Sequence, residues 1–161
     1  MAKTIGAKHM SNHTAVVRWS RSDQKFTDNQ YSRVHEWAFD GGIQLRASSS
    51  PHAVRLPFSD PSAVDPEEAF VAAVSSCHML TFLYLAAKKG FRVDSYVDEA
   101  MGVLETIQKG RMGITRVMLH PKIVFSGDKL PSGEEIENLH HHSHEECYIA
   151  NSVKCEITWS I

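Results

Sequence analysis

The sequence has no excess of charge of one sign and no long apolar run, and each absence argues against a class of partner. Its 161 residues carry 17 Lys and Arg against 19 Asp and Glu, a formal net charge of -2 with neutral histidines. This balance provides no basic face for nucleic acid, so no nucleic-acid partner is expected. No apolar run comes near the ~20 residues that span a bilayer, so no membrane partner is expected either.

The sequence also lacks an export signal and is poor in cysteine. Residues 1–20 contain no continuous apolar segment of the kind that a signal peptide needs, so a cytoplasmic location is expected. The three cysteines are an odd number, and their spacing matches no zinc ribbon or knuckle. In a reducing cytoplasm a persistent structural disulfide is not expected. A cysteine pair there is either transient and catalytic or simply two buried thiols.

What the chain does have is the ordinary composition of a globular protein. Hydrophobic residues make up 42% and charged residues 22% of the sequence. The length suffices for one domain with a sizeable core. We expect a single domain over residues 1–161, of which 1–11 form a loose N-terminal tail.

A long helix is predicted from residue 65 to about residue 89. Asp65 is a good N-cap, Pro66 suits the first helical position, and Glu68 completes a capping-box arrangement. Lys89 suits the negative end of the helix, and Gly90 fits the left-handed position that follows it. The helix is apolar almost all round, so we expect it to be covered on most sides.

A second helix is predicted to begin after Ser132, with Glu135 at its third position, and to run to about Cys147 or Tyr148. Alternating and β-branched patterns predict strands elsewhere. These strands are expected at 13–19, 31–39, 43–47, 96–108, 115–125 and 153–161. The order of strands, long helix, strands, helix and strand predicts an α+β fold.

Cys77 lies in the middle of the long helix, and its reactivity requires a cation. A thiol reduces a peroxide only as its thiolate, and burial raises a thiol pKa. The helix dipole acts only within the first turn, so it does not activate Cys77. Arg33 and Arg46, on the upstream predicted hairpin, are the candidate cations.

Glu67 is a carboxylate on the same helix that cannot reach Cys77 within one chain. Their separation of ten positions corresponds to about 15 Å along a helix. A second copy of the helix, packed antiparallel, would bring its own glutamate to Cys77, and the small residues along the helix would permit close approach. An intertwined homodimer with shared sites is therefore a hypothesis.

Two motifs carry a resemblance to a known family. Residues 65–68, Asp-Pro-Glu-Glu, are followed by small and apolar residues and then by Ser-Ser-Cys-His-Met-Leu at 75–80. Residues 144–152 read His-Glu-Glu-Cys-Tyr-Ile-Ala-Asn-Ser. Together they resemble the signatures of the OsmC/Ohr family of cysteine-based hydroperoxide reductases, and the order of elements fits from about residue 14 to residue 161.

The resemblance implies a role for individual residues. It makes Cys77 the peroxidatic thiolate and Cys147 the resolving cysteine, and it places Glu67 at the family's carboxylate position. Arg33 matches the thiolate-stabilising arginine, with Arg46 as the alternative. It further implies an organic hydroperoxide substrate, an external dithiol reductant such as a lipoylated protein, an intertwined homodimer with two long central helices, and no cofactor.

Two positions depart from the family's usual pattern. His78 follows the first cysteine where phenylalanine is common, and Tyr148 follows the second where proline is common. These departures indicate a side branch of the family.

Other interpretations of the same residues remain open. His140, His144 and Cys147, together with His78, permit a metal-binding protein. A non-catalytic protein that binds an apolar ligand on the same fold is the other alternative. Cys155 alternates with core-facing residues of the last predicted strand and is interpreted as structural.

Overall fold

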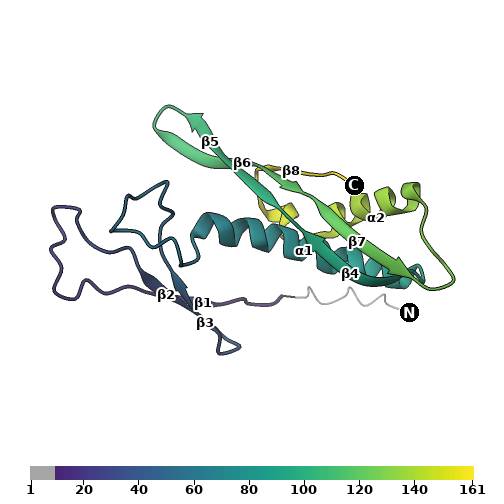
Figure 1. Cartoon of the computed structure of the whole chain (residues 1–161), viewed down its shortest axis with the longest axis horizontal. Helices are drawn as coiled ribbons and strands as arrows, with labels where there is room; N and C mark the ends of the chain where they lie inside the picture. The colour runs from purple at the N-terminus through teal and green to yellow at the C-terminus, as the bar shows by residue number, and fades with distance from the viewer. Residues whose placement is uncertain (1–9) are drawn as a thin grey trace, which may run out of the picture. The chain divides into compact units, whose positions relative to one another are not determined.

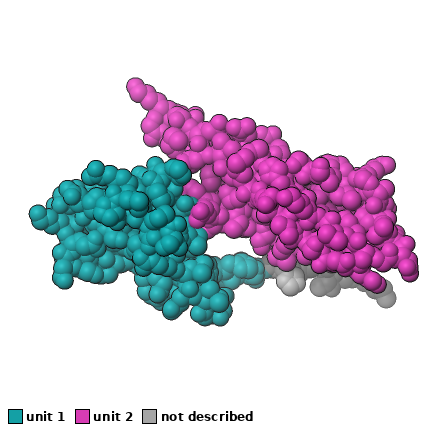
Figure 2. All heavy atoms as spheres, in the orientation of Figure 1, with its two compact units in different colours: residues 1–66 teal, residues 67–161 magenta. Residues whose placement is uncertain are grey.

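A computed structural model describes residues 10–161, and the chain divides into two compact units, Met1–Pro66 and Glu67–Ile161 (Figures 1 and 2). Residues 1–9, most of the predicted N-terminal tail, lie outside the described residues. The two units are described separately below, and the single domain over 1–161 stays a prediction.

Unit 1 contains a three-stranded antiparallel sheet, in the order β1-β2-β3 (Figure 1). Its strands are β1 (Ala15–Arg18), β2 (His35–Phe39) and β3 (Gln44–Ala47). The turn between β2 and β3 contains Gly42 with φ +85°, a conformation that glycine adopts without strain. The predicted strand at 31–39 begins late, because residues 31–34 belong to a loop.

Unit 2 contains both helices and the remaining strands. They are α1 (Pro66–Lys88), β4 (Arg92–Asp98), β5 (Met101–Gln108), β6 (Arg111–Leu119), β7 (Pro121–Ser126), α2 (Gly133–Glu146), the short 3-10 helix η1 (Ala150–Ser152) and β8 (Glu156–Trp159). Strands β4 and β7 pair antiparallel. In the other sheet β6 lies between β5 and β8, antiparallel to β5 and parallel to β8. The predicted α+β fold is confirmed.

The two predicted β-rich segments between the helices are four strands. The segment expected at 96–108 divides after Asp98, and the one expected at 115–125 divides at His120. The Asp98 carboxylate accepts a hydrogen bond of 2.7 Å from the His120 backbone N–H, which joins the two breaks. Each long segment therefore contributes one strand to each of two sheets.

Both helices begin and end close to the predicted residues. Ser132 caps α2, and its side chain and that of Glu135 exchange the two hydrogen bonds of a capping box. After α1, Gly90 has φ +80°, as the predicted left-handed position requires.

One stripe of α1 is buried, and it joins two hydrophobic clusters. The stripe repeats every four residues and consists of Val74, His78, Phe82 and Ala86. Val74 packs with residues of β6 and β8, whereas Phe82 and Ala86 pack with Phe91 and with Leu139 of α2. The core thus lies between α1, the strands and α2.

The opposite face of α1 is exposed and uncharged. Leu80 is 61% exposed and Tyr84 is 60% exposed, and Ala72, Ala73, Ser76 and Ala87 are also exposed. The expectation that the helix is covered on most sides is therefore wrong for the single chain. The stripe packs against the strands and α2 of unit 2, and within residues 67–161 no strand or second helix is packed against the other face.

By length and composition alone α1 could also cross a bilayer, so the expectation of no sufficiently long apolar run is wrong. The core helix of a globular protein passes the same test.

Candidate active site

Cys77 lies at the middle of α1, next to the buried stripe. It directly precedes His78 of that stripe, and its side chain is half-buried. Ser75, two residues earlier, donates a short hydrogen bond from its hydroxyl to Asp98 of β4. This bond attaches to β4 the turn of α1 in which Cys77 lies.

Cys147 is the first residue after α2, and its side chain is buried. Its Sγ accepts a 3.3 Å hydrogen bond from the Ala150 backbone N–H. Burial raises the pKa of the Cys147 thiol, and interaction with the Cys77 side chain raises it further. The structure thus brings together the two cysteines that the sequence singles out, 70 positions apart, and leaves both as free thiols.

Cys155 lies immediately before β8. It packs against the cluster of Val74, Val117 and Ile157, and burial raises its pKa. It also lines an apolar hollow of about 340 Å³ together with Phe70 and other residues. Its position fits the structural role expected for it.

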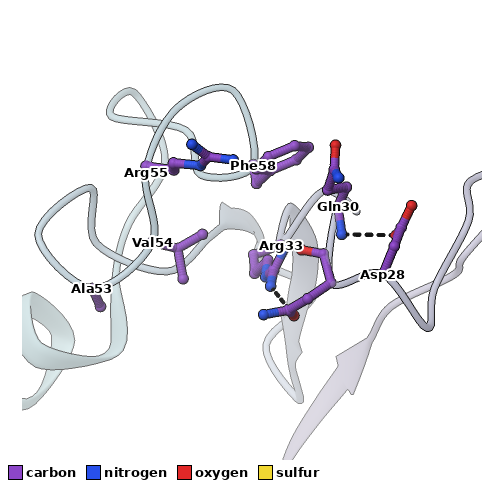
Figure 3. A pocket seen from close by; sticks show the side chains of 8 residues that line it. Asp28, Gln30, Arg33, Ala53, Val54, Arg55 and Phe58 are labelled. Carbon is purple, nitrogen blue, oxygen red and sulfur yellow. Dashed lines mark hydrogen bonds between the residues drawn. The ribbon is translucent and has the colours of Figure 1, made fainter.

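Arg33 belongs to unit 1, where its guanidinium is held in a defined position. It donates hydrogen bonds to the Asn29 backbone oxygen at 3.0 Å, to Asn29 Oδ1 at 2.6 Å, and to the Tyr31 backbone oxygen. It also lies over the Tyr31 ring, 3.8 Å from the centroid. With Arg55 and Phe58, among others, it lines a pocket of about 310 Å³. Figure 3 shows these side chains from close by.

Arg46, the alternative cation, is occupied by a carboxylate within unit 1. Its Nε and Nη2 donate to Asp60 Oδ2 at 3.0 and 2.7 Å. Hydrogen bonds from Ser62 and from Arg46 lower the pKa of Asp60 to about 2. Both arginines are therefore engaged within unit 1, and the role of thiolate-stabilising cation stays a prediction for either residue.

Glu67 is the second residue of α1 and is half-buried. Since α1 is unbroken from Pro66 to Lys88, Glu67 lies about 15 Å from Cys77 along the helix. It does not contact Cys77 within this chain, as expected, and its catalytic role stays a prediction.

A buried histidine pair adjoins the cysteines, and its role was not predicted from the sequence. His78 Nε2 lies 2.9 Å from His140 Nδ1, and the two rings stack with centroids 5.2 Å apart. Burial lowers the pKa of each to about 4, so both imidazoles are neutral at physiological pH. The sequence does contain a signal for the burial of His78: it lies four residues after Val74 and four before Phe82, on the same face of the helix.

The metal-binding alternative finds no support in this cluster. Within residues 10–161, no group of three or more His, Cys, Asp or Glu side chains is arranged to hold a metal ion. His140 Nε2 and His144 Nδ1 are buried without a hydrogen-bond partner.

Comparison with known proteins identifies the family. The sequence profile of the family described as OsmC-like protein matches residues 59–161. The chain belongs to the OsmC-like family. This confirms the OsmC/Ohr resemblance, and the match includes both cysteine motifs. A search of curated proteins found no match.

Solved structures of OsmC-like proteins agree with this assignment. An OsmC-like protein of unknown function from Vibrio cholerae is 54% identical, with a TM-score of 0.91, covering 94% of this chain and 99% of the other. An organic hydroperoxide resistance protein from Elizabethkingia anophelis is 17% identical, with a TM-score of 0.69 and coverage of 96% and 99%. One from Legionella pneumophila is 18% identical, with a TM-score of 0.66 and coverage of 96% and 100%. At such identities the last two show a shared fold, and the family as a whole points to a peroxide-related function.

Proposed function

We propose that this OsmC-like protein is a thiol-dependent peroxidase that reduces organic hydroperoxides to alcohols. The observation that carries the proposal is the interaction of the Cys77 and Cys147 side chains, which come from the middle of one helix and the end of another. Two free thiols close enough for one to raise the pKa of the other can form and release a disulfide during turnover.

In the first step Cys77 acts as the nucleophile. Its thiolate attacks the distal oxygen of the hydroperoxide, the O–O bond breaks, and the alkoxide leaves as the alcohol after taking up a proton. Cys77 is oxidised to the sulfenic acid. Arg33 is proposed as the cation that stabilises the thiolate before attack.

In the second step Cys147 resolves the sulfenic acid. Its sulfur attacks Cys77 Sγ, an S–S bond forms, and the hydroxyl leaves as water with the proton of the Cys147 thiol. Because the raised pKa keeps Cys147 protonated at neutral pH, that proton is available for the leaving hydroxyl. An external dithiol, such as a lipoylated protein, then reduces the disulfide by exchange.

A homodimer is part of the proposal, because it would supply the carboxylate. The exposed face of α1 is uncharged from Ala72 to Ala87, and covering it with a second α1 would remove apolar surface from water. In an antiparallel arrangement the partner's Glu67 would approach Cys77, which the same chain's Glu67 does not contact.

The test is peroxide consumption by the purified protein with dihydrolipoamide as reductant. Cumene hydroperoxide and hydrogen peroxide are compared for the wild type, Cys77→Ser and, as the matched control, Cys155→Ser. We expect turnover with the organic peroxide, loss of turnover in Cys77→Ser, and retention in Cys155→Ser. Absence of turnover with Cys77 left unoxidised contradicts the proposal.

A further inference from the structure

The His78–His140 hydrogen bond is a buried polar link between the two helices that carry the thiols. His78 is 1% exposed and His140 is 0% exposed, and their 2.9 Å bond joins α1 to α2. A buried imidazole nitrogen that loses its hydrogen-bond partner destabilises the structure, because the lost hydration is not replaced. The bond therefore stabilises the spacing of α1 and α2 at which it forms, relative to other spacings at which it would be broken.

Each histidine is tied through its helix to one of the cysteines. His78 is the residue after Cys77 on α1. His140 lies two turns before Cys147, on the buried face of α2 that also includes Ser143. A change in the spacing of the two rings is thus transmitted to the spacing of the two thiols.

Aromatic neighbours hold the histidine pair in place. The His140 ring lies 4.5 Å from Phe82 of α1 and 6.1 Å from Trp159 of β8, measured between centroids. Trp159 is itself fixed by a 3.0 Å hydrogen bond from its Nε1 to Glu137 on α2. With rings on several sides, the pair has little freedom to adjust to a displaced helix.

The two chemical steps depend differently on the spacing of the helices. Attack on the peroxide needs Cys77 alone, whereas disulfide formation needs Cys147 Sγ to reach bonding distance, about 2.05 Å, of Cys77 Sγ. The rate of a reaction between two groups that the protein holds in position depends strongly on their geometry. A displacement of 1 Å can lower such a rate by about 10²-fold. A determinant of helix spacing therefore acts on the second step.

We propose that His78 and His140 are a positioning pair for the resolving step: their hydrogen bond holds α2 against α1 so that Cys147 reaches the oxidised Cys77. This inference rests on the proposed peroxidase function. It assigns the pair no contact with substrate and no role in the attack on peroxide.

The test separates the two steps in a single turnover. Reduced protein is mixed with one equivalent of cumene hydroperoxide. Loss of the Cys77 thiol and formation of the Cys77–Cys147 disulfide are followed in quenched samples by mass spectrometry, with a dimedone trap for the sulfenic acid.

Matched variants at one position test the hydrogen bond itself. In His140→Asn the side-chain amide takes the place of Nδ1 and keeps the bond to His78, whereas in His140→Gln it is displaced by one methylene. We expect Cys77 oxidation at the wild-type rate in both. We expect disulfide formation slowed at least about tenfold, with accumulation of trapped sulfenic acid, in His140→Gln, and rescue in His140→Asn. His141→Gln is the control, because His141 is exposed on the same helix.

Each remaining outcome counts against the inference. Disulfide formation at the wild-type rate in folded His140→Gln overturns it, and so does equal slowing of both steps, which indicates a purely structural role. If His140→Gln does not fold, the pair His78→Gln and His78→Leu repeats the comparison, since Gln places its amide near Nε2 and Leu has none. A wild-type protein whose Cys77 is not oxidised refutes the peroxidase itself, a result that no histidine variant would produce alone.

Discussion

Acidification should destabilise the protein through the buried histidine pair. Burial lowers the pKa of His78 from its ordinary value of 6.5 to about 4, and that of His140 likewise. Between these values the unfolded chain binds a proton that the folded chain excludes. The free energy of unfolding therefore falls as the pH drops from 6.5 towards 4, and this contribution is constant above 6.5.

The size of the effect follows from the pKa difference. A histidine that titrates at 6.5 unfolded and at about 4 folded lowers the stability by about 2 kcal/mol at pH 5 and about 3 kcal/mol at pH 4. At pH 5 the unfolded chain binds a proton on each histidine and the folded chain binds neither, so the pair contributes about twice this amount, about 4 kcal/mol. Repulsion between two charged imidazoles 2.9 Å apart further disfavours protonation of both in the folded state. Glu137 and Asp98 attract a charge on His140, whereas His140 and His144 oppose one on His78.

The assay is urea unfolding of the reduced protein at pH 7.5 and pH 5, at fixed protein concentration. The comparison is the double variant His78→Gln/His140→Asn, which keeps a hydrogen bond but does not titrate. Carboxylate titration affects both proteins alike, so the wild type should lose about 4 kcal/mol more than the variant, which lacks both titrating histidines. Equal losses in the two proteins would refute the reasoning.

Three further substitutions test the packing and the caps. Phe82→Ala removes a fully buried ring and should lower the free energy of unfolding by about 3–5 kcal/mol, against little change for the exposed Val124→Ala. In Gly102→Ala the new Cβ would lie 2.5 Å from Val71 Cγ2, so we expect a loss of about 1–3 kcal/mol in urea unfolding, partly restored by adding Val71→Ala. Ser132→Ala removes the cap of α2 and should destabilise by about 1 kcal/mol, with Ser132→Asp close to wild type; an unchanged midpoint for Ser132→Ala would contradict the capping box.

The helices could be predicted from the sequence because their signals are local. The Asp-Pro start of α1, the glycine after it, and the Ser132–Glu135 box each lie within a few residues of the boundary that they mark. The end of α2 was less certain, since Cys147 and Tyr148 include neither glycine nor proline. Local chemistry therefore placed Cys147 in or beside a helix but did not fix it at the helix end.

The sheet arrangement and the site could be predicted only in part. The breaks after Asp98 and at His120 depend on a hydrogen bond between residues 22 apart, and the parallel pairing of β8 with β6 depends on the whole of α2 between them. The cysteine pair was expected from motifs. The His78–His140 bond joins residues 62 apart, and no local pattern indicates that two histidines share a buried site.

The most direct test of the central claim is the identity of the disulfide formed by one equivalent of cumene hydroperoxide. Reduced wild-type protein is oxidised, alkylated without reduction, digested and mapped by mass spectrometry. The account predicts a Cys77–Cys147 cross-linked peptide, with Cys155 recovered as the alkylated thiol. A protein that retains both Cys77 and Cys147 as alkylated thiols, or that links either one to Cys155 instead, would contradict it.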